Sequence, residues 1–332
     1  MHNIDELSIV YGPVLSWRFG RSLGIDVISG VKTCSFNCIY CQLGRTINFL
    51  ANPNELRNPI SPENVLKSLK SILEGIDLES IDVVTFSGLG EPTLNPKLED
   101  IIKEVKKIRL GKPHVILTNS SLMHIKKVRN ALQNFDIVCA KLDAGDRPAF
   151  LRINRPYKEV SNLNRIINAI KEFKKTFSGK LMIQSMFLRT RDGFTNSKGE
   201  QLRHLVDKIR LIEPDVIQID TPYRPGGEEF IEYLKVNELL NVAKEFEKYF
   251  SREVLWVFGI HDMRGKSVRW RSKRDIETSV LELLKRRPCR IFDICDSLDL
   301  SYRDAEQIVR NLISKGLVKE FKTKLDVYFK AS

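Results

Sequence analysis

Three cysteines lie close together near the start of the chain, in a polar stretch that follows an apolar run. Cys34, Cys38 and Cys41 have the spacing C-x3-C-x2-C. Cysteine binds metals as the thiolate and favours iron–sulfur clusters or zinc over hard cations. Three thiolates on one short loop can hold three irons of a cubane cluster, which leaves the fourth iron without a protein ligand. Such an open iron is a place for chemistry.

A structural zinc site is the main alternative for these cysteines. Structural zinc normally has four protein ligands, and all five histidines are remote in sequence: His2, His114, His124, His204 and His261. A distant ligand could still complete a zinc site, so this alternative stays open from the residues alone. The other three cysteines are scattered through a 332-residue chain, which does not suit a disulfide framework.

The cysteine motif, with the aromatic Tyr40 directly before the last cysteine, resembles that of the radical S-adenosylmethionine (radical SAM) superfamily. The resemblance implies a [4Fe-4S] cluster on Cys34, Cys38 and Cys41. It implies that the fourth iron chelates the amino and carboxylate groups of S-adenosylmethionine (SAM), with Tyr40 near the adenine. The implied reaction is reductive cleavage of SAM to methionine and a 5′-deoxyadenosyl radical, which abstracts hydrogen from a substrate.

A glycine-rich stretch, Ser87-Gly-Leu-Gly-Glu-Pro92, follows the second predicted strand. The superfamily carries a Gly-Gly-Glu motif at this point, where it binds the methionine amino group. Leu89 replaces the first glycine, whereas Gly90 and Glu91 keep the matching positions. The resemblance therefore implies a backbone contact from Gly90 and a carboxylate contact from Glu91. An ordinary strand-to-helix turn is the alternative explanation of the glycines.

Polar residues also end the next two predicted strands. Asn119 follows the third strand, and Lys141 and Asp143 end the fourth. The resemblance implies that such residues reach the SAM carboxylate or ribose, and we predict that Asp143 accepts hydrogen bonds from ribose hydroxyls. Gln184 and Gln218, on the next two strands, are either pocket residues or interior polar residues satisfied by their neighbours.

Strand and helix patterns alternate about six times in the first 250 residues. Predicted strands cover 22–28, 81–86, 114–118, 136–143, 180–187 and 215–220, and predicted helices cover 61–75, 96–109, 123–133, 158–177, 197–211 and 228–249. Residues 1–20 and the cysteine loop are predicted to be irregular, and 253–258 a last strand. This alternation of mostly apolar strands with helices predicts a parallel sheet covered on both faces. The predicted fold is α/β, a partial (β/α)6 TIM-type barrel with its site at the C-terminal strand ends.

The pattern predicts three regions along the chain. Residues 1–260 are the radical SAM partial barrel, and 261–274 are a linker dense in Lys and Arg that contains Trp270. Residues 275–332 read as helix, helix, helix and hairpin, the order typical of a winged helix-turn-helix domain.

The net charge of +12 and the pI near 9.4 suit an anionic partner such as nucleic acid, a phosphorylated substrate or an acidic electron carrier. Reduced flavodoxin or ferredoxin is the electron donor that the resemblance implies. Five arginines are predicted to face one basic rim: Arg152, Arg155, Arg189, Arg191 and Arg224.

Shorter motifs, including Cys41-Gln-Leu-Gly-Arg-Thr46 and Arg152-Ile-Asn-Arg-Pro156, resemble one group of iron–sulfur oxidoreductases that is sometimes placed with wyosine-type tRNA synthetases. We therefore take tRNA or other RNA as the first substrate hypothesis, with the winged helix as docking module. Modification of a protein or a small molecule is the alternative, and a non-enzymatic iron–sulfur regulator that binds nucleic acid is a third. The sequence contains no apolar run of about 18 residues, so no membrane span is predicted. The few cysteines are not spaced as a disulfide framework, which predicts a cytoplasmic protein.

Overall fold

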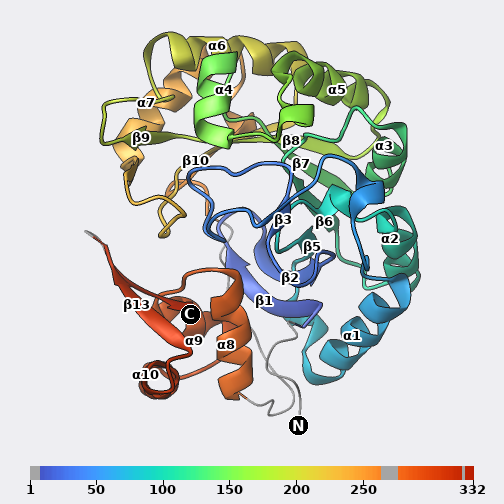
Figure 1. The fold of residues 1–332 in the computed structure, drawn as a ribbon, viewed down its shortest axis with the longest axis vertical. Coiled ribbons are helices and arrows are strands. Elements are labelled where there is room, and N and C mark those ends of the chain that lie inside the picture. Colours follow the sequence, from blue (N-terminus) through green and yellow to red (C-terminus); the bar gives the residue numbers. More distant parts are fainter. Residues whose placement is uncertain (1–7, 263–275, 324–325) are drawn as a thin grey trace.

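A computed structural model describes residues 8–262, 276–323 and 326–332 (Figure 1). Its centre is an eight-stranded sheet in the order β1-β2-β5-β6-β7-β8-β10-β12. The strands are β1 (Val10–Ser16), β2 (Gly20–Asp26), β5 (Val83–Ser87), β6 (His114–Thr118), β7 (Ile137–Lys141), β8 (Lys180–Met186), β10 (Val216–Asp220) and β12 (Leu255–Val257). Neighbours pair in parallel except β1 and β2, which are antiparallel. The predicted α/β fold with a mostly parallel sheet is confirmed, and it is consistent with a TIM-type partial barrel.

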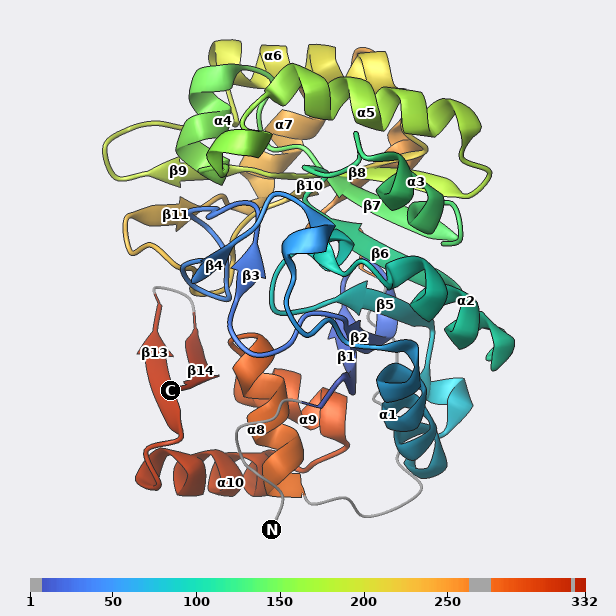
Figure 2. The same cartoon turned by 45° about the vertical axis from the view of Figure 1, so that its right-hand side comes forward.

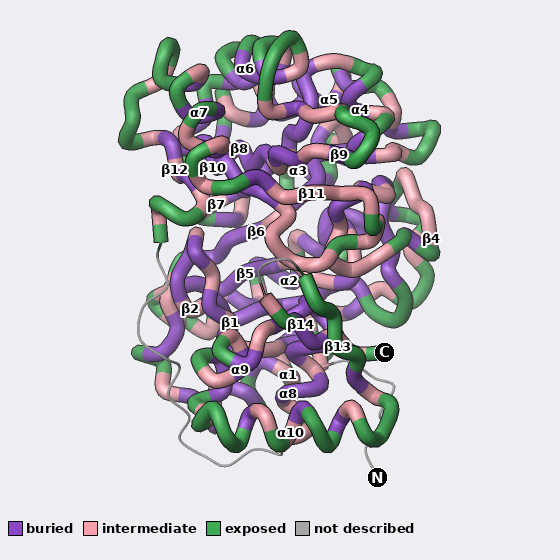
Figure 3. Tube along the Cα trace, turned by 90° about the vertical axis from the view of Figure 1, so that its left-hand side faces the viewer, coloured by how far each residue is buried: buried purple, intermediate pink, exposed green. Residues whose placement is uncertain are grey.

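Helices between the strands cover the outer face of the sheet (Figure 2). They are α1 (Pro62–Gly75), α2 (Leu98–Lys107), α3 (Lys126–Leu132), α4 (Arg147–Asn154), α5 (Leu163–Thr176), α6 (Gly199–Ile212) and α7 (Val236–Glu247). The start of α1 shows the local cause: the Ser61 side chain accepts from Asn64 N, and Pro62 occupies the first turn. Figure 3 shows mostly buried residues along the central strands, with exposed residues mainly on the helices and loops around them.

Two regular elements near the site differ from the sequence prediction. Residues 10–16, predicted irregular, form edge strand β1, in which a bulge between Tyr11 and Val14 accommodates Gly12 and Pro13. Proline is tolerated there because an edge strand and a bulge leave backbone donors unused. Helix α4 was not predicted, and the Asp146 side chain caps it by accepting from Ala149 N at 2.9 Å.

The start of the predicted helix 228–249 is also different. Residues 231–233 form strand β11 (Ile231–Tyr233), which pairs antiparallel with β9 (Leu188–Thr190), so the helix begins only at Val236. The local sequence gives no sign of this pairing, because its partner lies some forty residues away in the chain.

The C-terminal elements form a module of their own, residues 276–331. They are α8 (Ile276–Arg286), α9 (Ile291–Leu298), α10 (Tyr302–Ser314) and the antiparallel strands β13 (Val318–Lys322) and β14 (Val327–Ala331). Their apolar side chains form a separate cluster, against which Val14 of β1 packs. Figure 1 shows this module beside β1. Most of the predicted basic linker, from residue 263 on, lies outside the described residues.

Within the described ranges, the structure holds no helix that is both long enough and apolar enough to cross a membrane.

Candidate active site

The cysteine loop crosses the C-terminal ends of the parallel strands and is fixed on one side by the turn after β5. Short strand β3 (Thr33–Cys34) pairs with β4 (Asn48–Phe49) within the loop. Thr33 N donates to Leu89 O at 2.9 Å, and Glu91 N donates to Thr33 O at 3.1 Å. Gly90 lies between these bonds with φ +156°, and a Cβ there would stand 1.6 Å from Thr33 O. Glycine is therefore required for the backbones to approach this closely.

The opposite side of the loop is fixed by the end of α4. Ile39 N donates to Ile153 O at 2.9 Å, and Tyr157 N donates to Ser35 O at 2.8 Å. The Asn154 side-chain nitrogen donates to Asp143 Oδ2 at 2.7 Å and to Cys38 Sγ at 3.5 Å. The Arg152–Pro156 motif thus holds the backbone of the cysteine loop and contacts one of its sulfurs.

Cys34, Cys38 and Cys41 line one cavity of about 340 Å³. Burial raises the pKa of the Cys34 thiol, with a further contribution from Glu91. Burial and then Asp143 raise the pKa of Cys38 to about 11. Thiolates in this environment need a positively charged partner, which iron supplies. The Asn119 amide also donates to Cys34 Sγ at 3.4 Å, and hydrogen bonds to the sulfurs are typical of iron–sulfur sites.

The cysteine arrangement fits a cluster better than a single zinc ion. A zinc site needs all its ligands within about 2.3 Å of one point. In the part of the chain that the structure describes, no three His, Cys, Asp or Glu side chains converge in that way. In a cubane cluster each thiolate binds a different iron, so the sulfurs stand further apart. Three cysteine donors around one cavity are the donor set that a [4Fe-4S] cluster takes.

Glu91 is almost fully buried and lines the same cavity. Its Oε1 accepts from the Thr93 and Thr118 hydroxyls, both at 2.6 Å, and from Thr93 N at 3.1 Å. Its Oε2 accepts from Asn119 N at 2.6 Å. Burial raises the pKa of Glu91 in spite of these donors. Since a carboxylate oxygen accepts about two hydrogen bonds, Oε2 keeps capacity for a further donor.

Asn119 and Asp143 are placed to hold other site residues. The Asn119 side-chain nitrogen donates to Ser35 Oγ at 2.8 Å as well as to Cys34, so it fixes the start of the cysteine loop. The Asp143 carboxylate accepts from the Tyr40 hydroxyl at 2.5 Å and from Met186 N at 2.8 Å, in addition to Asn154. Asp143 is not among the residues that line the cavity, whereas Tyr40 is.

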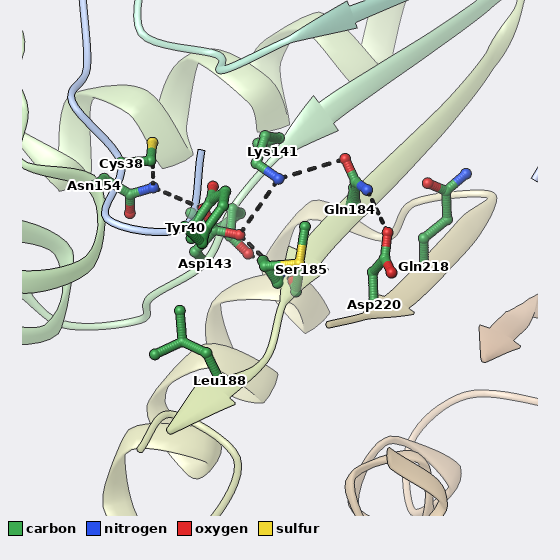
Figure 4. A network of polar contacts seen from close by, with 12 residues as sticks. Cys38, Tyr40, Lys141, Asp143, Asn154, Gln184, Ser185, Leu188, Gln218 and Asp220 are labelled. Atoms are coloured by element: carbon green, nitrogen blue, oxygen red, sulfur yellow. Dashed lines mark hydrogen bonds and ion pairs between the residues drawn. The ribbon is translucent and has the colours of Figure 1, made fainter. Parts of the chain in front are cut away.

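Lys141 bridges this network to the barrel interior, as Figure 4 shows. Its ammonium lies 4.8 Å from the centre of the Tyr40 ring and 3.5 Å from Gln184 Oε1. Gln184 in turn donates to Asp220 Oδ2 at 2.9 Å. Gln184 and Asp220 line the cavity, whereas Gln218 is fully buried and accepts from Arg18 and Cys139. Of the two glutamines, Gln184 is therefore the pocket residue and Gln218 the interior one.

Comparison with known proteins decides the family. Residues 28–192 match the radical SAM superfamily. A UPF0026 protein of Methanocaldococcus jannaschii is 30% identical over 314 residues, which cover 93% of this chain and 92% of that protein. The chain belongs to the UPF0026 family of the radical SAM superfamily. It is therefore an enzyme whose cofactors are a [4Fe-4S] cluster and SAM.

Two further similarities have a narrower meaning. "GTPase Obg" of Brachyspira hyodysenteriae is 33% identical over 311 residues. The match covers 94% of this chain but only 43% of that protein. Among solved structures, TYW1 with a lysine-pyruvate adduct bound gives a TM-score of 0.50 at 20% identity, covering 70% of this chain and 74% of that one. This second similarity supports the radical SAM fold alone.

The predicted basic rim is only partly formed. Arg152 pairs with Asp192, Arg155 with Glu228, and Arg189 with Glu232 and Glu238. Three of the five arginines are thus balanced by carboxylates at the surface, as expected of solvated side chains. Only Arg224 lines the cavity among the five, all of which the structure describes.

Sequence reasoning missed several residues of this radical SAM site. Asn154 belongs to the Arg152–Pro156 motif, for which the sequence predicts no role in the site. Its contact with Cys38 depends on helix α4, which was not predicted. Arg286 and Arg287 come from the end of α8, yet both line the same cavity as the cysteines. No local signal could place them there, because their position depends on how the C-terminal module packs against β1.

Proposed function

We propose that this chain cleaves SAM reductively at a [4Fe-4S] cluster held by Cys34, Cys38 and Cys41. When bound and reduced, the cluster supplies the electron that splits SAM into methionine and a 5′-deoxyadenosyl radical. The observation that carries the proposal is the meeting of the three cysteines with Glu91 and Tyr40 around one cavity of about 340 Å³. That volume is in the range of small-molecule sites.

The surrounding residues divide into those that contact SAM and those that position them. Glu91, through its free capacity at Oε2, and the backbone at Gly90 are proposed to receive the methionine amino group. Tyr40 and Lys141 are proposed to line the adenosyl side. Asn119 is proposed to act by holding Cys34, and Asp143 by fixing the Tyr40 hydroxyl; the contact of Asp143 with ribose stays a prediction.

Electron delivery and substrate docking belong to the same proposal. A reduced flavodoxin or ferredoxin, an acidic protein, suits the net charge of +12. Residues 1–260 are proposed as the radical SAM barrel, 261–274 as a basic linker and 275–332 as a winged-helix domain. The order of three helices and a hairpin in the C-terminal module supports the winged-helix assignment.

RNA, with tRNA first, is the proposed substrate class, and the basic charge of the chain and its resemblance to wyosine-type enzymes support it. A small anionic molecule is the second candidate, because side chains of the C-terminal module, two of them arginines, form part of the cavity wall. Mass spectrometry of RNA hydrolysates and of metabolites from a deletion strain separates the two. A modified nucleoside that disappears supports RNA, and an accumulated anionic metabolite with unchanged RNA supports the second candidate.

The cofactor assignment has a spectroscopic test. Electron paramagnetic resonance of the reduced, reconstituted protein should show a [4Fe-4S]+ signal whose shape changes when SAM is added. Cys38→Ala should lose the signal and most of the bound iron and sulfide. A Cys139→Ala control should keep both, because Cys139 lies in the barrel interior away from the cysteine loop. Full iron and sulfide content in Cys38→Ala would contradict the ligand assignment.

A further inference from the structure

Two arginines of the C-terminal module line the active-site cavity. Arg286 ends α8 and Arg287 follows it, and they are 5% and 8% exposed. Both line the cavity that holds the three cysteines. Arg18, just after β1, and Arg224, after β10, line it as well. We call Arg18, Arg224, Arg286 and Arg287 the arginine cluster.

The hydrogen bonds that the arginine cluster makes leave donors without a partner. Arg287 donates to Leu15 O at 3.2 Å, and Arg18 reaches Gln218 Oε1 only at 3.5 Å. Arg286 donates to Glu282 O and Ser8 O, and its guanidinium lies 4.0 Å from the Tyr11 ring centre. The Nε atom of each of the four is buried without a hydrogen-bond partner among the described residues.

Cationic side chains outnumber carboxylates around the cavity. Five cationic side chains line it, namely the arginine cluster and Lys141, against two carboxylates, Glu91 and Asp220, and the three cysteines, whose thiolate charge an iron–sulfur cluster would largely offset. No ion pair joins a member of the arginine cluster to a carboxylate anywhere in the described ranges. Asp26, Asp220 and Asp293 lie near members of the arginine cluster but form no ion pair with them, so an anion in direct contact would add stabilisation. The guanidinium fork matches the oxygens of phosphate or carboxylate groups.

SAM by itself does not explain this excess of positive charge. Its sulfonium and amino groups are cationic and only its carboxylate is anionic, so it brings net positive charge into the cavity. The cysteine loop and Glu91 also lie at the strand ends, whereas Arg286 and Arg287 come from a different module. A second molecule with anionic charge is the ligand that this wall suits.

There is room next to the arginine cluster for more than a small anion. A second cavity of about 420 Å³ shares Arg224, Leu15, Trp17 and Tyr223 with the first. It lies between the barrel and the C-terminal module, since Arg290 and Tyr328 also line it. Asp293 and Asp326 line this second cavity as well, so a substrate that places its anionic group at Arg224 would extend a part without negative charge into this space.

We propose that the C-terminal module completes the substrate site, and that the arginine cluster binds an oxyanion group of the substrate, a phosphate or a carboxylate. Arg287, Arg224 and Arg18 have the most free donors and make the direct contacts, and Arg286 adds charge while anchoring α8. The inference rests on the proposed function, since it names the chemistry of the substrate that the radical SAM site receives.

The test uses the full-length protein, anaerobically reconstituted and saturated with SAM, and titrates pyrophosphate and citrate by calorimetry at low salt. At least one of the two should bind, and the tighter one identifies phosphate or carboxylate as the group recognised. Arg287→Gln and Arg224→Gln should each weaken this binding about tenfold. Arg287→Lys should lose less, because it keeps the charge but not the fork. Arg303→Gln, on exposed α10, should leave the affinity unchanged.

Several results would overturn the proposal. Absence of binding by both anions would do so, as would equal affinities for wild type and both glutamine variants. A loss of SAM affinity in Arg287→Gln that matches the loss for the anion would assign the arginine to SAM instead. If Arg287→Gln does not fold, Arg224→Gln becomes the deciding variant. Among the described residues Arg224 makes no side-chain hydrogen bond, so this substitution breaks none. Anion binding in a protein that makes no 5′-deoxyadenosine would refute the proposed function and leave the anion site standing.

Discussion

Asn154 links three residues of the site through one amide nitrogen, which donates to Cys38 Sγ and to Asp143 Oδ2. Asp143 in turn holds the Tyr40 hydroxyl. A donor to a cluster ligand stabilises the thiolate and tunes the reduction potential of the cluster. The position of Asn154 therefore makes it a positioning residue for the cluster and for the adenosyl side together.

We expect Asn154→Ala to lower iron affinity or the rate of SAM cleavage by about 10–100-fold, and to move the reduction potential of the cluster to more negative values. Iron and sulfide analysis, a potentiometric titration and 5′-deoxyadenosine formation measure these effects. Asn130→Ala is the control, because Asn130 is exposed on α3. An unchanged potential with unchanged turnover would remove Asn154 from the site.

Asp26 is a second residue with a measurable consequence. Both carboxylate oxygens accept from Leu89 N, at 3.2 and 3.1 Å, so Asp26 holds the turn after β5. Burial raises the pKa of Asp26 to about 7. Between pH 4 and 7 the folded protein keeps a proton that the unfolded chain has lost. The contribution of Asp26 to stability therefore falls as the pH rises and levels off above pH 7.

We predict that the free energy of unfolding of Asp26→Asn, relative to wild type, rises by up to about 4 kcal/mol between pH 4 and 8. Urea unfolding of the cluster-free protein at several pH values measures this difference. Asp100→Asn, at an exposed position of α2, is the control for the loss of one carboxylate. A flat profile for Asp26→Asn would contradict the raised pKa.

At the scale of single residues, the sequence identified groups whose chemistry is carried by type and spacing. Cys34, Cys38, Cys41, Tyr40 and Glu91 all line one cavity. For Asn119 and Asp143 the strand pattern predicted the place but not the partners, because hydrogen bonds to Cys34 and Tyr40 depend on side-chain directions in the folded state.

Among the elements, the turn after β5 and the cysteine loop behave as one unit. Their backbones exchange hydrogen bonds at Thr33, and the close approach allows only glycine at position 90. The glycine-rich motif thus has a structural role in addition to any contact with SAM. The turn and the loop are expected to lose order together when this contact is disturbed.

Gly90→Ala should destabilise the protein by roughly 2 kcal/mol or more, since the new Cβ would meet a backbone carbonyl that cannot move freely. Iron content after reconstitution should fall with it. Gly111→Ala is the matched control: its φ is also positive, +66°, but nothing lies within 4 Å of the added Cβ, so a cost of about 1 kcal/mol is expected. Equal losses in the two variants would contradict the close contact.

Elements with a strong local pattern were predictable, and those that depend on distant partners were not. Strand β6 matches the predicted 114–118 and helix α1 the predicted 61–75, because a bounded apolar run or an amphipathic period defines each. Strand β1 is a pairing of an edge segment that contains Gly12 and Pro13. Its formation depends on β2 and on the C-terminal module, which no local window of the sequence contains.

On the scale of the whole molecule, the C-terminal module is joined to the site at several points. Arg287 donates to Leu15 O, Val14 packs on the module's apolar cluster, and Lys330 of β14 donates to Gln42 O at 2.9 Å, next to Cys41. The module is therefore in contact with the cysteine loop. Binding of the cluster and SAM should therefore change the dynamics of the module's elements that lie nearest to the site.

We predict that cluster reconstitution with SAM slows hydrogen exchange in β14 and at the end of α8. Amides of α10 should change little, because this helix packs mainly on α8, α9 and β13. Hydrogen–deuterium exchange measured by mass spectrometry, with and without cluster and SAM, makes the comparison within one molecule. Slower exchange in the cysteine loop with no change in β14 would show that the module is not coupled to the site.

The central claim is that the three-cysteine loop carries a cluster that cleaves SAM. Its most direct test is anaerobic incubation of the reconstituted full-length protein with dithionite and SAM, followed by quantification of 5′-deoxyadenosine and methionine. We predict both products in equal amounts from wild type, and neither from Cys38→Ala. Wild-type protein with a full complement of iron and sulfide that forms no 5′-deoxyadenosine would contradict it.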